Sequence, residues 1–206
     1  AKEYLAQGRS LYDPQQHHSH VFLYGVDPGV FCLSRTAYVL WLFGYPEQAM
    51  KRSQEVLVLA QELAHFNTLA GILAFASWFY QLCREEQRAK ERVEAVITLS
   101  TEQGLPFWLA VGQSCRGWLL AEQGQVEEGI AQVRQGIAAY RATGAEIHWP
   151  IQSLVALAEV CLKVGRTEEG LSAFVEAVDF MNSHEERWLE AEVYRLKGEL
   201  LLTQEI

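Results

Sequence analysis

The sequence predicts an all-α fold, an α-α superhelix of stacked helical hairpins, on three observations. A hexapeptide recurs with a period of 40–41 residues, and apolar residues around each copy recur at helical spacing. No stretch alternates between apolar and polar residues for long enough to indicate a sheet. A period of this length is typical of a solenoid, because one hairpin cannot bury its own apolar face and stacking supplies the core. We expect a tetratricopeptide-like solenoid of about four hairpins plus terminal helices.

The recurring hexapeptide predicts the turn inside each hairpin. Its copies are "GYPEQA" at 44–49, "REEQRA" at 84–89, "GQVEEG" at 124–129 and "GRTEEG" at 165–170. A glycine just past an apolar helical run supplies the left-handed conformation that ends a helix. Pro46 suits the first turn of the next helix, and the glutamates that follow lie near its positive end. A small sixth residue, such as Gly129, lets the second helix approach the first closely.

The flanking segments predict the helices in chain order. After "GRTEEG" the apolar residues follow helical spacing, as Leu171, Phe174, Val175, Val178 and Met181. The expected hairpins pair 28–43 with 46–64, 67–83 with 86–102, 106–122 with 126–142, and 147–163 with 167–182. A final helix at about 185–203 begins a fifth copy, and residues 1–11 form the end of a preceding one.

These helices predict one tetratricopeptide-like domain over residues 1–206. The expected repeats are about 28–66, 67–105, 106–146 and 147–184, with a partial repeat at 185–206. The chain begins at Ala1, and "AKEYLAQGRSLY" has the pattern of the middle of an amphipathic helix. We therefore expect a fragment of a larger protein.

Composition limits the classes of partner. The net charge of −9 disfavours nucleic acid, because phosphate binding needs a basic surface. No apolar run approaches the roughly 20 residues that cross a bilayer, so we expect no membrane partner. The four cysteines are far apart and form no C-x-x-C pair, which favours buried thiols in the reducing cytoplasm.

Four longer phrases resemble a known family. They are "SLYDPQQHHSHVFLYGVDPGV", "LWLFGYPEQAMKRSQEVLVLAQEL", "RGWLLAEQGQVEEGIAQVRQGIAAYRATGAE" and "ERWLEAEVYRLKGELLL". They look like the C-terminal tetratricopeptide-like region of bacterial signalling ATPases fused to adenylate/guanylate cyclase or kinase domains. The resemblance implies a sensor or scaffold region, similar in role to the helical-repeat arm of the maltose-regulon activator. It does not imply ATP hydrolysis, because the sequence has no G-x-x-x-x-G-K-[ST] loop.

One column of the repeat alignment predicts a binding surface. In tetratricopeptide-like stacks the first helix of each pair lines the concave face, and the position six before the turn points into it. That column contains Tyr38, Trp78, Trp118, Glu159 and Glu199, and a neighbouring column contains Trp41 and Gln81. Exposed aromatic rings in such a track would anchor a peptide or a ligand. The alternative is that the rings fill the core between helices.

The segment 13–28 breaks the period. It carries three histidines, His17, His18 and His20. His17 and His20 are three residues apart with Asp13 nearby, which makes a zinc or nickel site conceivable. The pattern lacks a second ligand pair at a defined spacing, so we expect no metal, no other cofactor and a solvated or hydrogen-bonded loop. Loops of this length often serve recognition, so the segment is a second interaction candidate.

The sequence carries no recognisable catalytic motif. It has no G-x-S-x-G, no H-E-x-x-H and no supported Cys–His arrangement. We expect a non-enzymatic interaction or scaffold module of a bacterial signalling protein that binds a protein, a peptide or neighbouring domains of its parent on the concave face. The alternatives are an effector-sensing domain that regulates an attached ATPase or cyclase, and an all-α enzyme using the histidine segment with a metal. Apolar residues on the terminal helices, such as Leu5 and Leu200, leave a homo-oligomer open.

Overall fold

The regular elements of the described chain are helices, as the sequence predicts. The structure, a computed structural model, describes residues 2–144, 150–185 and 187–203. Within these ranges every regular element is an α-helix or a short 3₁₀ helix, joined by turns. The expected all-α helical-repeat architecture is therefore confirmed.

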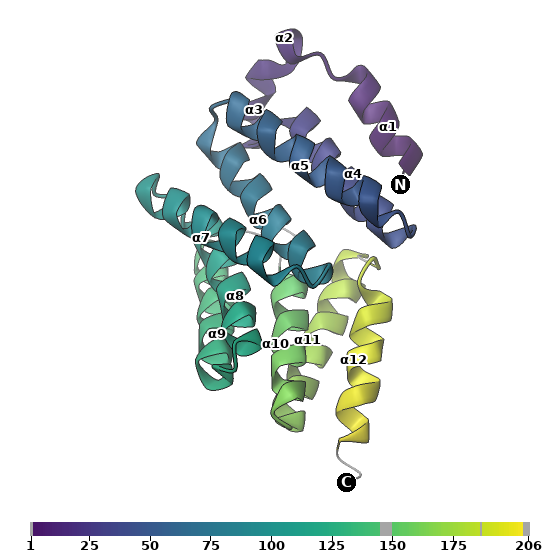
Figure 1. The fold of residues 1–206 in the computed structure, drawn as a ribbon, viewed down its shortest axis with the longest axis vertical. Coiled ribbons are helices and arrows are strands. Elements are labelled where there is room, and N and C mark those ends of the chain that lie inside the picture. Colours follow the sequence, from purple (N-terminus) through teal and green to yellow (C-terminus); the bar gives the residue numbers. More distant parts are fainter. Residues whose placement is uncertain (1, 145–149, 186, 204–206) are drawn as a thin grey trace. The chain divides into compact units, whose positions relative to one another are not determined.

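The chain divides into two compact units, residues 1–105 and 106–206. The first contains α1 (Lys2–Leu11), α2 (Pro14–His17), a 3₁₀ turn (His18–His20), α3 (Val21–Tyr24), α4 (Pro28–Leu42), α5 (Pro46–Glu62), α6 (Phe66–Leu82) and α7 (Glu86–Glu102) (Figure 1). The second contains α8 (Pro106–Glu122), α9 (Val126–Ala142), α10 (Pro150–Lys163), α11 (Thr167–His184) and α12 (Glu190–Leu202). The boundary coincides with the expected boundary between the second and third repeats. That the two units act as one domain stays a prediction.

Consecutive helices pack as hairpins inside each unit. The pairs are α4 with α5, α6 with α7, α8 with α9, and α10 with α11. Neighbouring hairpins stack, because α6 packs on α4 and α5, and α10 packs on α8 and α9. α1 packs on α4 and α12 packs on α10 and α11. The expected bounds of α8 and α9 match the structure, whereas the expected start of α10 at residue 147 lies outside the described residues.

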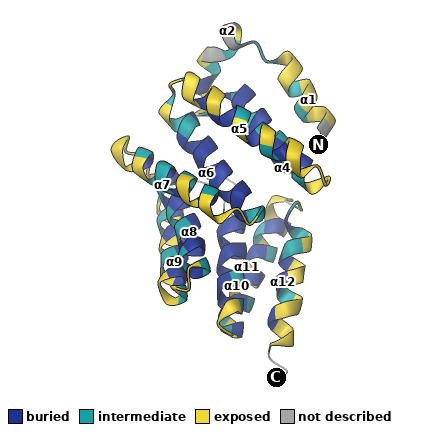
Figure 2. Ribbon diagram, viewed as in Figure 1, coloured by how far each residue is buried: buried dark blue, intermediate teal, exposed yellow. Residues whose placement is uncertain are grey.

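The two helices of a hairpin differ in burial. In unit 1, every residue of α6 from Ala70 to Gln81 is buried, whereas α5 buries a single stripe (Figure 2). That stripe contains Ala49, Ser53, Val56, Leu57 and Ala60, which is the spacing of one helical face. The first helix of the pair therefore forms the core layer, and the second covers it.

Residues with positive φ lie near the helix ends at nearly constant intervals of 19 to 21 residues. They are Gly25, Gly44, Ala64, Arg84, Gly104, Gly124, Gly144, Gly165 and Glu185. The hexapeptide predicts only alternate members of this series, those inside the hairpins. The turns between hairpins use the same left-handed conformation, so every helix from α4 to α11 ends in a similar way.

Small residues bring the helices of a hairpin together, as the sixth hexapeptide position predicts. A Cβ added to Gly129 of α9 would lie 2.6 Å from the Gly117 carbonyl oxygen and 3.0 Å from the Ala121 nitrogen of α8. A Cβ added to Gly136 would lie 2.7 Å from the Ser114 nitrogen. The two backbones are therefore too close for any side chain at these glycines.

Candidate interaction surfaces

The predicted concave column is buried at its aromatic members in unit 1. Tyr38 of α4 and Trp78 of α6 are 6% and 3% exposed, and their ring centroids are 5.2 Å apart. The Tyr38 hydroxyl donates a hydrogen bond to the Phe75 carbonyl oxygen. These rings join two successive hairpins through the core, so neither is open to a partner.

The column continues in unit 2 with the same geometry. Trp118 of α8 is 1% exposed, and its Nε1 donates a hydrogen bond to Glu159 Oε2 of α10 at 3.2 Å. Glu159 is half-buried, and Glu199 on α12 is exposed and forms an ion pair with Arg195. Tyr38 in unit 1 and Trp118 in unit 2 thus each donate a hydrogen bond to the next hairpin of their unit.

The residues of the neighbouring column differ in what they contact. Gln81 is buried, and Trp41 is half-buried with its ring centroid 6.2 Å from that of Phe79. In α8 the same position is Ala121, which lies against Gly129 of α9. Ala121 therefore belongs to a hairpin contact, whereas Trp41 lies against α6 of the next hairpin.

These positions correct the expectation that the aromatic rings lie exposed. Tyr38, Trp78 and Trp118 fill the core, which was the alternative. A repeat alignment identifies equivalent positions, but it does not say whether a ring at that position reaches solvent or the next helix layer. A role of the column in binding stays a prediction, carried by its partly exposed members Trp41, Glu159 and Glu199.

The histidine segment is tied down by local hydrogen bonds. The Nδ1 atom of His17 accepts the backbone N–H of Asp13 at 2.9 Å, and the His17 and His20 rings are 4.8 Å apart. The side chain of His18 lies outside the described part of the structure. Among the described residues, no group of three or more His, Cys, Asp or Glu side chains is placed to hold a metal.

The buried carboxylate of Asp27 links the two ends of this segment by hydrogen bonds. Asp27 Oδ2 accepts the Tyr12 hydroxyl at 2.6 Å, and Oδ1 accepts the Val30 N–H at 2.9 Å as the N-cap of α4. The Asp27 N–H donates to Thr68 Oγ1 of α6 at 2.9 Å. Burial, followed by the hydrogen bond to Asp27, raises the pKa of the Tyr12 phenol above its ordinary value. Residues 12 and 27 therefore hold the two ends of the segment together.

Between these ends lies the most exposed run of apolar side chains in the described chain. Phe22, Leu23 and Tyr24 of α3 are 81%, 74% and 66% exposed, and we call them the apolar ridge. The end of α3 is fixed to α6, because Asn67 Nδ2 donates to the Gly25 carbonyl oxygen at 2.6 Å. The histidines distinguish this segment in the sequence, but nothing there predicts the ridge, since "VFLY" is equally compatible with a buried strand or helix.

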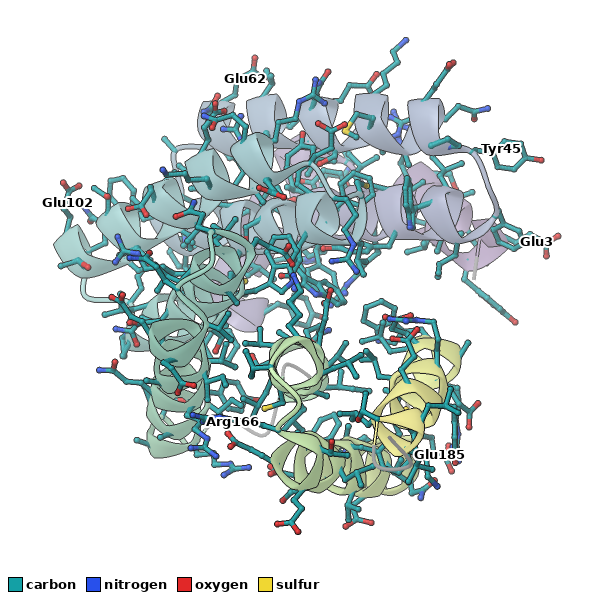
Figure 3. The ribbon with its side chains drawn as sticks, turned by 60° about the horizontal axis from the view of Figure 1, so that its bottom comes forward. Glu3, Tyr45, Glu62, Glu102, Arg166 and Glu185 are labelled. Atoms are coloured by element: carbon teal, nitrogen blue, oxygen red, sulfur yellow. The ribbon has the colours of Figure 1, made fainter. Side chains whose placement is uncertain are left out.

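Unit 2 has a hollow between α9, α10 and α11 with a volume of about 270 Å³. Its floor is apolar, formed by Ile137, Leu154 and Leu157. Two ion pairs line its sides, Arg134 with Glu169 and Arg141 with Glu176. A third arginine, Arg166 at the α10–α11 turn (Figure 3), pairs with Glu127 of α9. By contrast, the pocket beside Tyr38 in unit 1 measures only about 10 Å³, the space of about one water molecule.

Cys83 and Cys161 are free thiols in surroundings that disfavour the thiolate. Burial, with a smaller effect of Glu85, raises the pKa of Cys83 to about 12. Burial and then Glu169 raise the pKa of Cys161 to about 12 as well. A thiol with such a pKa is a poor nucleophile at neutral pH.

None of the described helices combines the length and the apolar character that crossing a bilayer requires.

Comparison with known proteins adds one structural relative. The sequence matches no protein-family model, and no curated protein matches it. The crystal structure of BtubC (BKLC) from P. vanneervenii is similar, with a TM-score of 0.59 and 15% sequence identity. The similarity covers 98% of this chain and 91% of that chain. At this identity it supports the all-α repeat fold and nothing about activity.

Proposed function

We propose that this chain is a non-catalytic interaction or scaffold module that binds a protein or peptide partner. The observation that carries the proposal is the apolar ridge, three consecutive large apolar side chains that extend into solvent. Soluble proteins rarely expose contiguous apolar surface without a binding role. Gly25, the residue after the ridge, accepts a hydrogen bond from Asn67, and the Tyr12–Asp27 hydrogen bond closes the segment that carries the ridge. Such anchoring lowers the conformational entropy that is lost on binding.

The chemistry of the ridge indicates the kind of partner surface. Phe22 and Tyr24 offer rings that bury about 150–250 Å² each, and such aromatic anchors dominate binding energies. An apolar pocket or groove on the partner is the complementary surface. The half-buried Trp41 and Glu159 and the exposed Glu199, from the two predicted columns, belong to the same proposal as a second contact region.

The resemblance to bacterial signalling ATPases sets the biological context of this proposal. In that context the partner is another protein or a neighbouring domain of a longer parent, and the location is cytoplasmic. The free, high-pKa thiols of Cys83 and Cys161 agree with a reducing compartment.

The test is quantitative binding of a partner recovered by affinity capture. The variant Phe22→Ser/Leu23→Ser/Tyr24→Ser should lose at least tenfold in affinity, with helicity and melting temperature close to wild type because the ridge packs against little. Val58→Ser and Val175→Ser, which alter exposed valines on α5 and α11, are the matched controls. Equal affinity of the ridge variant and the wild type would exclude the ridge as the contact.

The alternative function, effector sensing, is favoured by the hollow between α9, α10 and α11. Its apolar floor and charged sides match the composition of small-molecule sites, although about 270 Å³ lies just below their common range. A ligand found by thermal shift should raise the melting temperature of the wild type and not that of Ala138→Trp. Ala138 lines the hollow and is exposed, so a larger side chain there fills it without disturbing the core.

A further inference from the structure

The hollow between α9, α10 and α11 has one positive wall and one negative wall. Arg134 and Arg141 lie about two helical turns apart on α9, and Glu169 and Glu176 lie about two turns apart on α11. Each arginine pairs with a glutamate across the hollow, Arg134 with Glu169 and Arg141 with Glu176. The charged residues that line the hollow therefore balance one another, while the two walls keep opposite signs.

The floor of the hollow is apolar. Ile137 of α9 and Leu154 and Leu157 of α10 form it, and all three are buried. A water molecule takes about 30 Å³ in the liquid, so a hollow of about 270 Å³ holds about nine non-hydrogen atoms. That is the size of one small metabolite with an apolar group, and it is too small for a nucleotide.

The repeat does not require the charged walls. When the hairpins are aligned at their turns, the positions of the two arginines correspond to Gln54 and Gln61 of α5. The positions of the two glutamates correspond to Arg88 and Ala95 of α7. Neither combination of these residues makes an ion pair. Two hairpins of unit 1 therefore stack without these charges, which is why we look for another role for them in unit 2.

The two ion pairs differ in how firmly they are held. The side chain of Glu169 is 21% exposed, and it also accepts a hydrogen bond from Arg166 at 3.5 Å. The side chains of Arg141 and Glu176 are 56% and 46% exposed. Ion pairs exposed to water contribute little to stability. The pair of Arg141 with Glu176 therefore opens at low cost, whereas Arg134 and Glu169 stay in place.

We propose that the hollow binds a free amino acid with an apolar side chain, whose two charged groups insert between Arg141 and Glu176. The guanidinium of Arg141 donates to the ligand's carboxylate, and the ligand's ammonium group donates to the carboxylate of Glu176. The ligand's side chain lies on the apolar floor. Each charge that loses its partner in the protein gains one in the ligand, so no charge is left unpaired.

The walls and the floor disfavour other ligands of this size. A carboxylic acid without an amine would leave Glu176 without a partner, and an amine without an acid would leave Arg141 without one. A sugar would place hydroxyl groups against the apolar floor, where they lose their hydrogen bonds to water. The inference rests on the effector-sensing alternative of the proposed function, whose ligand class it names, and it does not depend on the apolar ridge.

L-Leucine is the probe, because it combines both charges with a branched apolar side chain of suitable size. Titrated into the whole 206-residue protein labelled with nitrogen-15, it should give saturable shifts of the amide signals of Ala138 and Ser172, which line the hollow. Arg141→Gln and Glu176→Gln should each bind leucine at least tenfold more weakly. Wild-type protein should bind N-acetyl-L-leucine and L-leucinamide at least tenfold more weakly than leucine.

Combining the ligands with the variants tests each contact separately. N-acetyl-L-leucine lacks the ammonium group, so it should bind Glu176→Gln no more weakly than it binds the wild type. L-Leucinamide lacks the carboxylate, so Arg141→Gln should not weaken its binding further. Arg187→Gln breaks an exposed ion pair with Glu190 away from the hollow, and it should leave leucine binding unchanged. All three variants should melt close to the wild type, because the ion pairs that they break are exposed.

Two results would overturn the proposal. One is the lack of a saturable shift with millimolar leucine, and the other is equal binding of leucine and N-acetyl-L-leucine to the wild type. A different compound that shifts the same signals, and that Ala138→Trp excludes, would overturn the amino-acid ligand and leave effector sensing standing. The ridge variant and its captured partner test the interaction function independently of all these titrations.

Discussion

At the scale of single residues, the hydrogen bond between Tyr12 and Asp27 joins two ends of a segment that the sequence does not connect. Asp27 is buried, yet both carboxylate oxygens have donors, the Tyr12 hydroxyl and the Val30 N–H. A buried charge is tolerated when its hydrogen bonds are complete. The same carboxylate therefore starts α4 and anchors the segment that carries the apolar ridge.

Tyr12→Phe should lower the free energy of unfolding by about 1.5–3 kcal/mol, because it removes a hydrogen bond to a buried charged group. The folded protein raises the pKa of Tyr12, so the bond stabilises the fold fully below about pH 10, the pKa of an unfolded tyrosine, and is lost as pH rises further. Urea titrations at pH 7 and pH 10.5 should show that the free energy of unfolding decreases less between these two pH values in Tyr12→Phe than in the wild type. Tyr4→Phe, at an exposed tyrosine of α1, is the control and should match the wild type at both values. An unchanged pH dependence in Tyr12→Phe would contradict this role.

At the scale of helices, the turns and the hairpin contacts decide the architecture. Three of the left-handed turn residues are not glycine: Ala64 at φ 50°, Arg84 at φ 58° and Glu185 at φ 56°. A side chain in this conformation costs about 1–2 kcal/mol. The repeat geometry is therefore maintained against local strain at these three turns.

Ala64→Gly should raise the free energy of unfolding by up to about 1 kcal/mol, since the relief of strain exceeds the entropy that glycine adds to the unfolded chain. Gly124→Ala, where an added Cβ meets nothing within 4 Å, should lower it by about 1–2 kcal/mol through the backbone alone. Denaturant titrations of the two variants measure both changes. Destabilisation by Ala64→Gly would show that its turn is not strained.

The close contact of α8 with α9 gives a sharper comparison between two glycines. Gly136→Ala should cost about 1–3 kcal/mol, because its Cβ would enter the backbone of α8. Gly198→Ala should instead stabilise by about 0.5–1 kcal/mol, because it adds helix propensity in open space. Thermal and urea unfolding of both variants would check the opposite signs. The same sign for both would mean that the hairpins tolerate wider separation than their geometry indicates.

At the scale of the whole molecule, each unit contains complete hairpins with their own buried contacts. Helical repeats are stabilised by contacts within a repeat and with the next repeat, so a block of neighbouring repeats holds much of its stability internally.

Residues 106–206 expressed alone should therefore fold, with a helical circular dichroism spectrum and a cooperative thermal transition. The Gly136→Ala variant of the same piece should melt at a lower temperature, which shows that the native hairpin is present. A spectrum without helical minima would show that the contacts within the hairpins of unit 2 are not sufficient to fold it.

The sequence predicted the helices well because their signals are local. The hexapeptide marks each hairpin turn, and the apolar stripes located α8 and α9 at their observed bounds. The turns between hairpins were less visible, since Ala64 carries no glycine signal. The direction of the aromatic column was not predictable, because Trp78 and Trp118 have the same spacing whether they face solvent or the next helix.

The nearly constant interval between the left-handed turns limits how this protein can change in length. Removing a segment of two intervals returns the chain to the same helix of the next hairpin, travelling in the same direction. Removing one interval would exchange the two kinds of helix in all later hairpins. A second helix, which covers the core, would then stand where a first helix, which forms the core layer, is needed. Whole hairpins can therefore be gained or lost, whereas single helices in the middle of the stack cannot.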